Sequence, residues 1–186
     1  MTFTYHDTEL AYADFAYNTT RLNERAVELP VVWSWLQPGL RTLELGNVLG
    51  HYPGAPERTV VDRYEEAEGV DNRDVFDISD RWEQIVSVST VEHVRWDEGS
   101  EREAGGSQAA VKHLASLLEP GGRMLVTVPT GHNAPLDEWL MSGAGTTRAC
   151  TLVRDGDGWV QTDEVQIMPY GLPPGWAGAV WIGEWN

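Results

Sequence analysis

The sequence predicts an α/β fold in one domain, built on a mostly parallel sheet. Two observations support this prediction. Residues 41–50, RTLELGNVLG, have the pattern of a buried strand that carries an acidic residue and runs into a glycine turn. Further short apolar runs follow along the chain, and some of them also end in a carboxylate. Because ligands bind outside the carboxyl ends of the strands in an open parallel sheet, acids at those ends indicate a nucleotide-type site.

The residues before the first strand are expected to be helical. Over residues 20–36, Leu22, Ala26 and Leu29 fall on one face of a helix, and Pro30 is expected to kink or break it. We therefore expect residues 1–36 to form a helical lid segment, followed by an α/β core over residues 37–186.

The first connection within the sheet is expected to be short. Residues 51–58 contain two prolines and a glycine, so a full crossover helix is not predicted there, although parallel strands usually need about a dozen connecting residues. The second strand covers residues 59–62 and ends in Asp62, and a third acidic stop follows at residues 74–78. The first crossover helix should then have only one or two turns.

The remaining elements follow from apolar runs and turn signals. Asp155-Gly156-Asp157-Gly158 is typical of a hairpin turn. In chain order, the predicted elements are a strand at 84–90, a helix end at 111–118, a sharp turn at 119–122, a strand at 123–129, a short helix at 136–141, the two hairpin strands at 149–154 and 159–162, and a terminal strand at 179–185.

The order of these motifs resembles that of class I S-adenosylmethionine-dependent methyltransferases, and more closely a small bacterial subgroup associated with glycan and natural-product gene clusters. The resemblance is carried by the blocks at 17–28, 44–52, 59–65, 87–94 and 117–129. It implies a Rossmann-like methyltransferase fold with a seven-stranded sheet, in which the terminal strand runs antiparallel to its neighbours. A dinucleotide-binding fold would keep its sheet parallel.

The resemblance implies S-adenosyl-L-methionine as the cofactor. Asp62 would then take the ribose hydroxyls, Asp74 and Val75 would frame the adenine, and Ser89 and Thr90 would lie beneath the sulfonium. The methionine half of the cofactor would be lined by Glu44, Gly46, Asn47 and Gly50. Taken one by one, the residues leave other roles open, because Asp74 could be a solvated loop acid and Ser89 or Thr90 could be a helix cap.

The resemblance also implies residues near the acceptor. The general base would be His93, because it follows the fourth strand and an imidazole titrates near neutral pH. A purely structural role for His93 stays open, with His51, His132, Glu92 and Asp137 as other candidate bases. The residues expected to act as a lid or to hold substrate are Tyr17, Asn18, Thr20, Asn23, Arg25, His132 and Asn133. The expected reaction is methylation of a small polar acceptor, most plausibly a hydroxyl of a sugar or secondary metabolite.

The first loop departs from the family pattern and keeps other functions open. Asn47, Val48 and Leu49 separate Gly46 from Gly50, where a typical methyltransferase has further glycines. A methyltransferase-like module that binds a nucleotide or partner protein without turnover is therefore the main alternative. A nicotinamide-dependent oxidoreductase ranks below it, because its pyrophosphate needs a helix amino terminus and a middle glycine.

Composition excludes several other classes. The 186 residues are 41% hydrophobic, enough for one domain with a sizeable core. The net charge of -16 disfavours binding to nucleic acids or anionic membranes. The single cysteine excludes an internal disulfide, and no signal-peptide pattern is present, so a cytoplasmic location is expected. No known metal-ligand spacing appears, so no metal site is predicted. The oligomeric state is left open.

Overall fold

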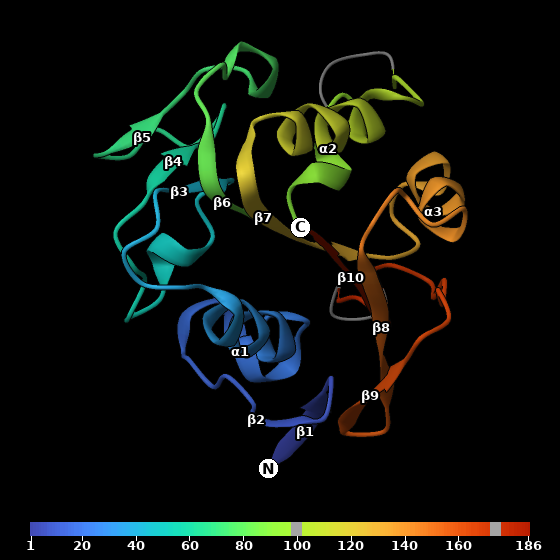
Figure 1. The fold of residues 1–186 in the computed structure, drawn as a ribbon. Coiled ribbons are helices and arrows are strands. Elements are labelled where there is room, and N and C mark those ends of the chain that lie inside the picture. The colour runs from blue at the N-terminus through green and yellow to red at the C-terminus, as the bar shows by residue number, and fades with distance from the viewer. Residues whose placement is uncertain (98–101, 172–175) are drawn as a thin grey trace.

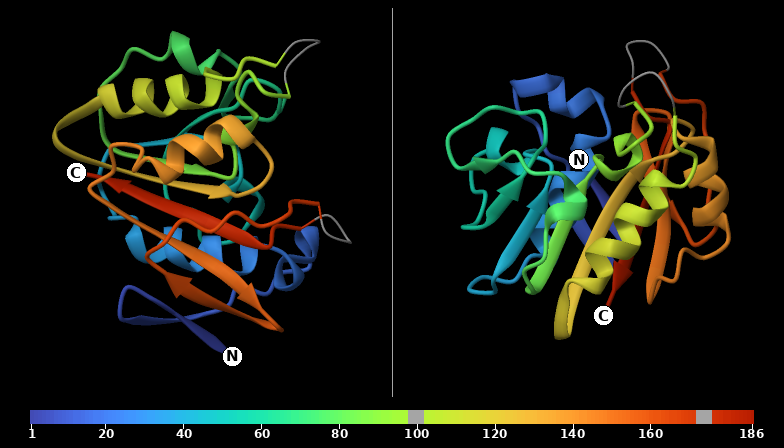
Figure 2. Two further views of the ribbon diagram at one scale, coloured as in Figure 1. Left: turned by 90° about the vertical axis from the view of Figure 1, so that its right-hand side faces the viewer. Right: turned by 90° about the horizontal axis from the view of Figure 1, so that it is seen from above.

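The computed structural model describes residues 1–97, 102–171 and 176–186. A central sheet has helices on both of its faces (Figures 1 and 2). It separates two hydrophobic cores. Helix α1 (Arg25–Trp35) packs on one face, and helices α2 (Gly106–Ser116) and α3 (Ala134–Met141) pack on the other. Among the described residues, no helix is both long enough and apolar enough to cross a membrane.

Within the described residues, the sheet has eight strands in the order β5-β4-β3-β6-β7-β10-β8-β9. Neighbouring strands from β5 to β7 run parallel, whereas β10 is antiparallel to both β7 and β8. The strands are β3 (Thr42–Leu45), β4 (Thr59–Val61), β5 (Val70–Asp71), β6 (Trp82–Val88), β7 (Leu118–Pro129), β8 (Arg148–Asp155), β9 (Gly158–Thr162) and β10 (Ala179–Trp185). This arrangement confirms the predicted Rossmann-like α/β fold with an antiparallel terminal strand.

The sheet differs in detail from the prediction of seven strands. The acidic stop at residues 74–78 lies in a 3-10 turn, η3 (Val75–Asp77), because the Asp74 carboxylate accepts a hydrogen bond from the Phe76 amide at 3.1 Å and caps the turn. The edge strand is instead β5, two residues long. The predicted hairpin is confirmed, since Asp155 of β8 pairs with Gly158 of β9.

The predicted sharp turn at residues 119–122 lies within β7. The pairing between β6 and β7 shifts register there, with Trp82 opposite Leu118 and Gln84 opposite Arg123. Gly121 has a φ of +80°, a conformation that glycine adopts without a steric penalty. The turn signal therefore marks an irregularity inside a longer strand.

The N-terminal segment is not wholly helical, which corrects the prediction for residues 1–36. Strands β1 (Thr2–Tyr5) and β2 (Thr8–Ala11) form a separate two-stranded hairpin, followed by the 3-10 segment η1 (Tyr17–Leu22). The turn residues His6 and Asp7 have positive φ values of 44° and 63°. Such values suit a tight hairpin turn, but the turn lacks the glycine that usually announces one in a sequence.

The sequence predicted a kink or a break at Pro30, and helix α1 runs through Pro30 without breaking there. A proline inside a helix removes the hydrogen bond to the carbonyl four residues earlier, here that of Ala26. The Ala26 carbonyl accepts instead from the Ala13 amide at 2.9 Å. The chain entering the helix thus replaces the missing bond, and the helix can continue across the sheet.

The predicted short first crossover is confirmed. Between β3 and β4, the chain forms only one 3-10 turn, η2 (Leu49–His51). Another 3-10 turn, η4 (Val91–His93), follows the end of β6. These short turns leave the carboxyl ends of β3, β4 and β6 close to loops rather than beneath long helices.

Candidate functional site

A cavity of about 510 Å³ lies beyond the carboxyl ends of β3, β4 and β6. Its volume falls within the range typical of small-molecule sites. The predicted site residues that line it are Gly46, Asp62, Asp74, Val75, Ser89, Thr90 and His93. A larger cavity of about 920 Å³ lies near Arg41 and Gly121, at the opposite end of the strands, and contains none of the predicted site residues.

Gly46 brings the ends of β3 and β6 together. Its amide donates to the Val61 carbonyl at 2.8 Å, and its φ is +84°. A Cβ atom at this position would lie 2.2 Å from the Thr90 Oγ1 atom, far inside van der Waals contact. Only a glycine fits between the two loops without a shift, so this residue determines the shape of the cavity.

Asp62 is held rigidly by the backbone. Its Oδ1 atom accepts from the amides of Tyr64 and Glu65, each at 2.9 Å, and its Oδ2 atom accepts from the Asn47 amide at 3.1 Å. An ionised carboxylate offers about four lone-pair sites. Three of them are used, so Oδ2 keeps the capacity to accept from a ligand hydroxyl in the cavity.

Asp74 and Val75 form another part of the wall. The Asp74 Oδ2 atom accepts from Arg63 at 2.6 Å and from Arg95 at 2.7 Å. Val75 is 6% exposed and belongs to the core beneath the cavity. The Asp74 carboxylate is therefore an ion-paired group rather than a freely solvated loop acid, next to an apolar side chain that can contact a flat ring.

Ser89 and Thr90 line the cavity without capping the η4 turn, since Thr90 makes no side-chain cap hydrogen bond. The Thr90 hydroxyl donates to the Val88 carbonyl at 3.0 Å. Ser89 has a φ of +41°, which is rare and costly for a residue with a side chain. Its amide is held by the Thr127 carbonyl at 3.1 Å. Strain of this kind is common where a backbone is shaped for a ligand.

Glu44 and Gly50 do not line this cavity. Glu44 is fully buried, where its carboxylate forms an ion pair with Arg58 and accepts from the Leu49 amide at 2.7 Å. Burial raises the pKa of Glu44, although the Leu49 amide and Arg58 oppose that shift. Gly50 packs against Asn47, whose side-chain oxygen would lie 2.3 Å from an added Cβ. Both residues support the first loop from beneath.

Some of the predicted lid residues line a cavity together with predicted cofactor residues. A smaller cavity of about 190 Å³ is lined by Tyr17, Asn18 and Arg25 together with Asn47 and Asp62. It shares Asp62 with the cavity of about 510 Å³. The η1 segment therefore lies over the Asp62 end of the site.

The other lid residues hold the shape of this segment. Tyr17 stacks on His51 with ring centroids 4.7 Å apart. Thr20 is fully buried and donates to the Tyr17 carbonyl at 2.8 Å. Asn23 is 2% exposed and donates to the Asn18 carbonyl at 2.7 Å. Thr20 and Asn23 are thus structural, whereas Tyr17, Asn18 and Arg25 face the smaller cavity.

Glu28, which the sequence analysis did not single out, links helix α1 to the sheet. Its carboxylate forms an ion pair with Arg25 and accepts from the Ser89 hydroxyl at 2.5 Å and from the Thr127 hydroxyl at 2.6 Å. Glu28 has no exposed surface. A charged residue inside the apolar run Val27 to Val32 is the signal that could have revealed it.

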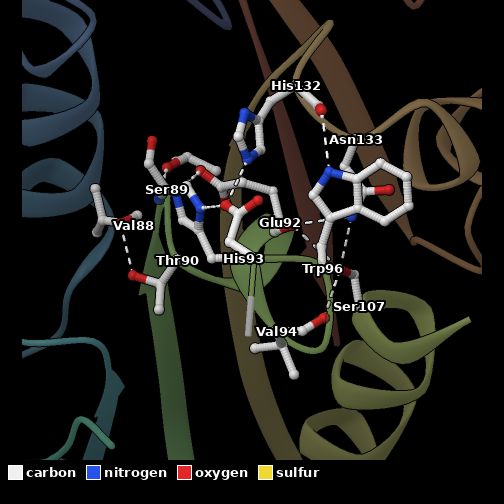
Figure 3. A network of polar contacts seen from close by, with 12 residues as sticks. Val88, Ser89, Thr90, Glu92, His93, Val94, Trp96, Ser107, His132 and Asn133 are labelled. Carbon is white, nitrogen blue, oxygen red and sulfur yellow. Dashed lines mark hydrogen bonds and ion pairs between the residues drawn. The ribbon is translucent and has the colours of Figure 1, made fainter. Parts of the chain in front are cut away.

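His93 belongs to a cluster with Asp97 and His132. Figure 3 shows the His93 and His132 rings close together, and their centroids are 4.7 Å apart. The Asp97 Oδ2 atom lies 2.5 Å from the His93 Nδ1 atom and 2.8 Å from the His132 Nε2 atom. Burial alone would raise the pKa of Asp97, but the hydrogen bonds from the two histidines outweigh it and lower that pKa. Sequence reasoning missed Asp97, although it stands four residues after His93.

Glu92 is buried next to this cluster. Its Oε1 atom lies 3.6 Å from the His93 Nε2 atom, and neither of its carboxylate oxygens has a hydrogen-bond partner among the described residues. Burial raises the pKa of Glu92 well above its ordinary value. An unpartnered buried carboxyl group is costly and calls for an explanation.

Asn133 has a structural role at the start of helix α3. Its side-chain oxygen accepts from the Leu136 amide at 3.1 Å, which caps the helix. Its side-chain nitrogen donates to the Glu92 carbonyl and to the Ser107 hydroxyl, each at 2.9 Å. Asn133 therefore fixes the backbone around Glu92 rather than lining a cavity.

Neither a protein-family model nor a curated protein sequence matches this chain. Among solved structures, magnesium protoporphyrin IX methyltransferase from Synechocystis PCC 6803 with bound S-adenosylhomocysteine is 12% identical, at a TM-score of 0.48, over 86% of this chain and 79% of that chain. The N-methyltransferase NodS from Bradyrhizobium japonicum WM9 is 11% identical, at 0.47, over 79% and 85%. An S-adenosylmethionine-dependent methyltransferase from Thermotoga maritima is 14% identical, at 0.48, over 81% and 83%. At these identities and scores, the function has to be inferred from the residues of this chain.

Proposed function

We propose that this protein is a methyltransferase that binds S-adenosylmethionine in the cavity beyond β3, β4 and β6. The proposed acceptor is a hydroxyl of a small polar molecule, such as a sugar or secondary metabolite. The main support is the position of Asp62, which follows β4, has a hydrogen-bond acceptor to spare and lies in the same cavity as the Gly46 turn. A carboxylate at this point of a parallel sheet suits a ribose diol.

The other residues of the cavity fit the remaining parts of the cofactor. Val75 offers an apolar surface for the adenine, and Asp74 stands beside it as a hydrogen-bond acceptor. Ser89 and Thr90 lie on the side nearer His93, where the methyl group would be presented. The antiparallel β10 favours this proposal over a nicotinamide-dependent oxidoreductase, whose sheet would be parallel.

In this proposal, His93 takes the proton of the acceptor hydroxyl. Methyl transfer needs alignment of the nucleophile with the methyl group and removal of one proton. If the His93 Nδ1–H group donates to Asp97, the Nε2 atom carries the lone pair that can accept this proton. Asp97 would then fix the tautomer and stabilise the charged ring, as carboxylates do beside catalytic histidines.

The first test is calorimetric titration of the protein with S-adenosylhomocysteine. We expect micromolar binding to the wild type and at least about tenfold weaker binding to Asp62→Ala, since a hydrogen bond to a charged group contributes roughly 1.5–3 kcal/mol. Asp80→Ala is the control, because Asp80 is exposed and pairs only loosely with Arg41 at 3.6 Å. Absence of binding to the wild type would refute the proposed cofactor.

Asp62 also orders its own loop, so Asp62→Ala could weaken binding by disordering the loop as well as by removing the hydrogen bond to the ribose. A second ligand separates these two effects. We expect the wild type to bind the 2′-deoxyribose analogue of S-adenosylhomocysteine more weakly, whereas Asp62→Ala should bind both ligands with similar affinity. If the variant still discriminates between the two ligands, the ribose hydroxyl is held by another residue.

Turnover distinguishes the enzyme from a binding module. The short η2 crossover is the observation that favours a non-catalytic module. With labelled S-adenosylmethionine and a panel of sugar and metabolite acceptors, we expect transfer by the wild type and a loss of about 10²–10⁴-fold in kcat for His93→Gln, the usual contribution of a general base. Cofactor binding without transfer to any acceptor would favour the module.

A further inference from the structure

The His93, Asp97 and His132 side chains come from two separate loops and converge on one point. One candidate ligand atom from each of the three residues lies within 4.8 Å of the other two. The Asp97 Oδ2 atom is 2.5 Å from His93 Nδ1 and 2.8 Å from His132 Nε2. Two imidazole nitrogens and a carboxylate oxygen are a donor set that divalent transition metals prefer. The three side chains are 44%, 37% and 18% exposed, so an ion can reach them from solvent.

The hydrogen bonding within the cluster also suits a cation. The His93 Nδ1 and His132 Nε2 atoms both lie within hydrogen-bond distance of the same oxygen, Asp97 Oδ2. Both rings must therefore donate an N–H group to this one atom. A metal ion would replace both protons and contact all three atoms at about 2.0–2.2 Å. Ligand atoms around one ion then lie up to about 4.2 Å apart, which small side-chain rotations would achieve here.

Glu92 supplies an independent observation. When a metal ion occupies the Nδ1 atom of a neutral histidine, the proton of the ring is on Nε2, and that group usually donates to a carboxylate or carbonyl. The His93 Nε2 atom faces the Glu92 Oε1 atom at 3.6 Å, and both Glu92 oxygens lack a hydrogen-bond partner among the described residues. A bound metal would give this buried carboxylate its partner.

We propose that His93, Asp97 and His132 bind a divalent transition-metal ion such as Zn²⁺. Glu92 would orient the His93 ring by accepting a hydrogen bond from its Nε2–H group. This proposal concerns binding by the cluster and does not depend on methyl transfer. Because His93 also lines the cavity of about 510 Å³, the ion would lie next to the proposed cofactor site. With a metal bound, the ion would polarise an acceptor hydroxyl, and the proton of that hydroxyl would pass to water instead of to His93. The sequence prediction of no metal site relied on local spacing, and His132 lies far from His93 in the sequence.

The test is calorimetric titration of the full-length protein with Zn²⁺ after treatment with a chelator. We expect one ion per chain, at least tenfold weaker binding by Asp97→Asn and by His132→Gln, and unchanged binding by His6→Gln. His6 is a suitable control, since it lies 3.9 Å from the single carboxylate of Glu184 and outside the cluster. Mg²⁺, which prefers oxygen ligands, should bind more weakly than Zn²⁺.

Thermal unfolding provides a second readout. Zn²⁺ should raise the melting temperature of the wild type and of His6→Gln, because a ligand that binds only the folded state stabilises it. It should raise the melting temperature of Asp97→Asn by less, because the variant binds the ion more weakly. Equal Zn²⁺ affinity in the wild type and both cluster variants would overturn the proposal and assign the binding to other surface carboxylates. S-adenosylhomocysteine titration of the same samples tests the cofactor site separately.

Discussion

At the scale of single residues, the burial of Asp137 makes the stability of the folded protein depend on pH. It is 4% exposed, its Oδ2 atom accepts from the Gly131 amide at 3.0 Å, and its Oδ1 atom has no partner among the described residues. Burial raises the pKa of Asp137 from 3.8 to about 6, against the opposing effects of the Gly131 amide and His132. The folded state therefore holds this proton more tightly than the unfolded state.

The raised pKa determines the sign of the pH dependence. Stability from the protonated Asp137 is fully present below pH 3.8 and is lost as the pH rises through about 6. Between pH 4 and pH 7, we expect the free energy of unfolding of the wild type to fall by about 1–2 kcal/mol relative to Asp137→Asn, which cannot ionise. Urea unfolding at a series of pH values measures this difference.

The matched control for this experiment is Asp80→Asn, because it makes the same replacement at an exposed aspartate. Its free energy of unfolding should follow that of the wild type at every pH. Parallel curves for the wild type and Asp137→Asn would show that Asp137 is ionised in the folded protein at acidic pH.

At the scale of elements, the contact between the loops after β3 and β6 depends on Gly46. Replacing it with alanine would force a φ of +84° on a residue with a Cβ and push that atom against Thr90. We expect Gly46→Ala to lower the free energy of unfolding by more than about 1 kcal/mol, the usual cost where alanine must adopt a positive φ. S-adenosylhomocysteine binding should weaken as well, because the cavity wall moves.

Gly54 separates the two causes of this loss. Its φ is +87°, almost that of Gly46, but no atom lies within 4 Å of a Cβ at this position. Gly54→Ala therefore measures the backbone cost alone, and the excess loss in Gly46→Ala measures the clash with Thr90. If urea unfolding shows equal losses of free energy of unfolding for the two variants, the loops after β3 and β6 separate easily enough to accommodate the alanine side chain at position 46.

At the scale of the whole molecule, the sequence predicted what depends on local patterns. The sequence carries local signals for the strands, for the acid at the end of β4 and for the hairpin turn near Gly156. The structure contains the strand and the hairpin that these signals predict. The β1–β2 hairpin has no such signal, because its turn residues His6 and Asp7 are not glycines. The burial of Glu44 was also missed, since its partner Arg58 is brought there only by the tertiary fold.

The candidate site was predictable to a similar extent. Residues that follow a strand end, such as Asp62 and Thr90, line the cavity, and their role in cofactor binding stays a prediction. Glu28 and the pairing of Asp97 with His132 were not predicted, because they depend on the distance between loops after folding. Sequence patterns indicate which strand ends lie together, whereas side-chain partners across the sheet require the three-dimensional packing.

The net charge of -16 has a consequence for the stability of the whole molecule. Like charges repel one another more strongly in the compact state than in the unfolded chain, and salt screens this repulsion. At about 0.15 M ionic strength the Debye length is about 8 Å, compared with about 30 Å at 0.01 M. Between these ionic strengths, we expect NaCl to raise the melting temperature by about 2–4 °C, which corresponds to about 1 kcal/mol for a chain of this size.

A charge variant tests whether repulsion between acidic residues causes the salt dependence of the melting temperature. It replaces Glu57, Glu66 and Glu68 by glutamine. All three side chains are exposed, so their replacement changes the surface charge with little effect on packing. Its melting temperature at low salt should be higher than that of the wild type, and its dependence on NaCl should be shallower. Tetramethylammonium chloride at equal ionic strength should act like NaCl if screening is the cause. A melting temperature that falls on addition of either salt would instead mean that favourable surface ion pairs, such as Arg73 with Asp71, outweigh the repulsion between acidic residues.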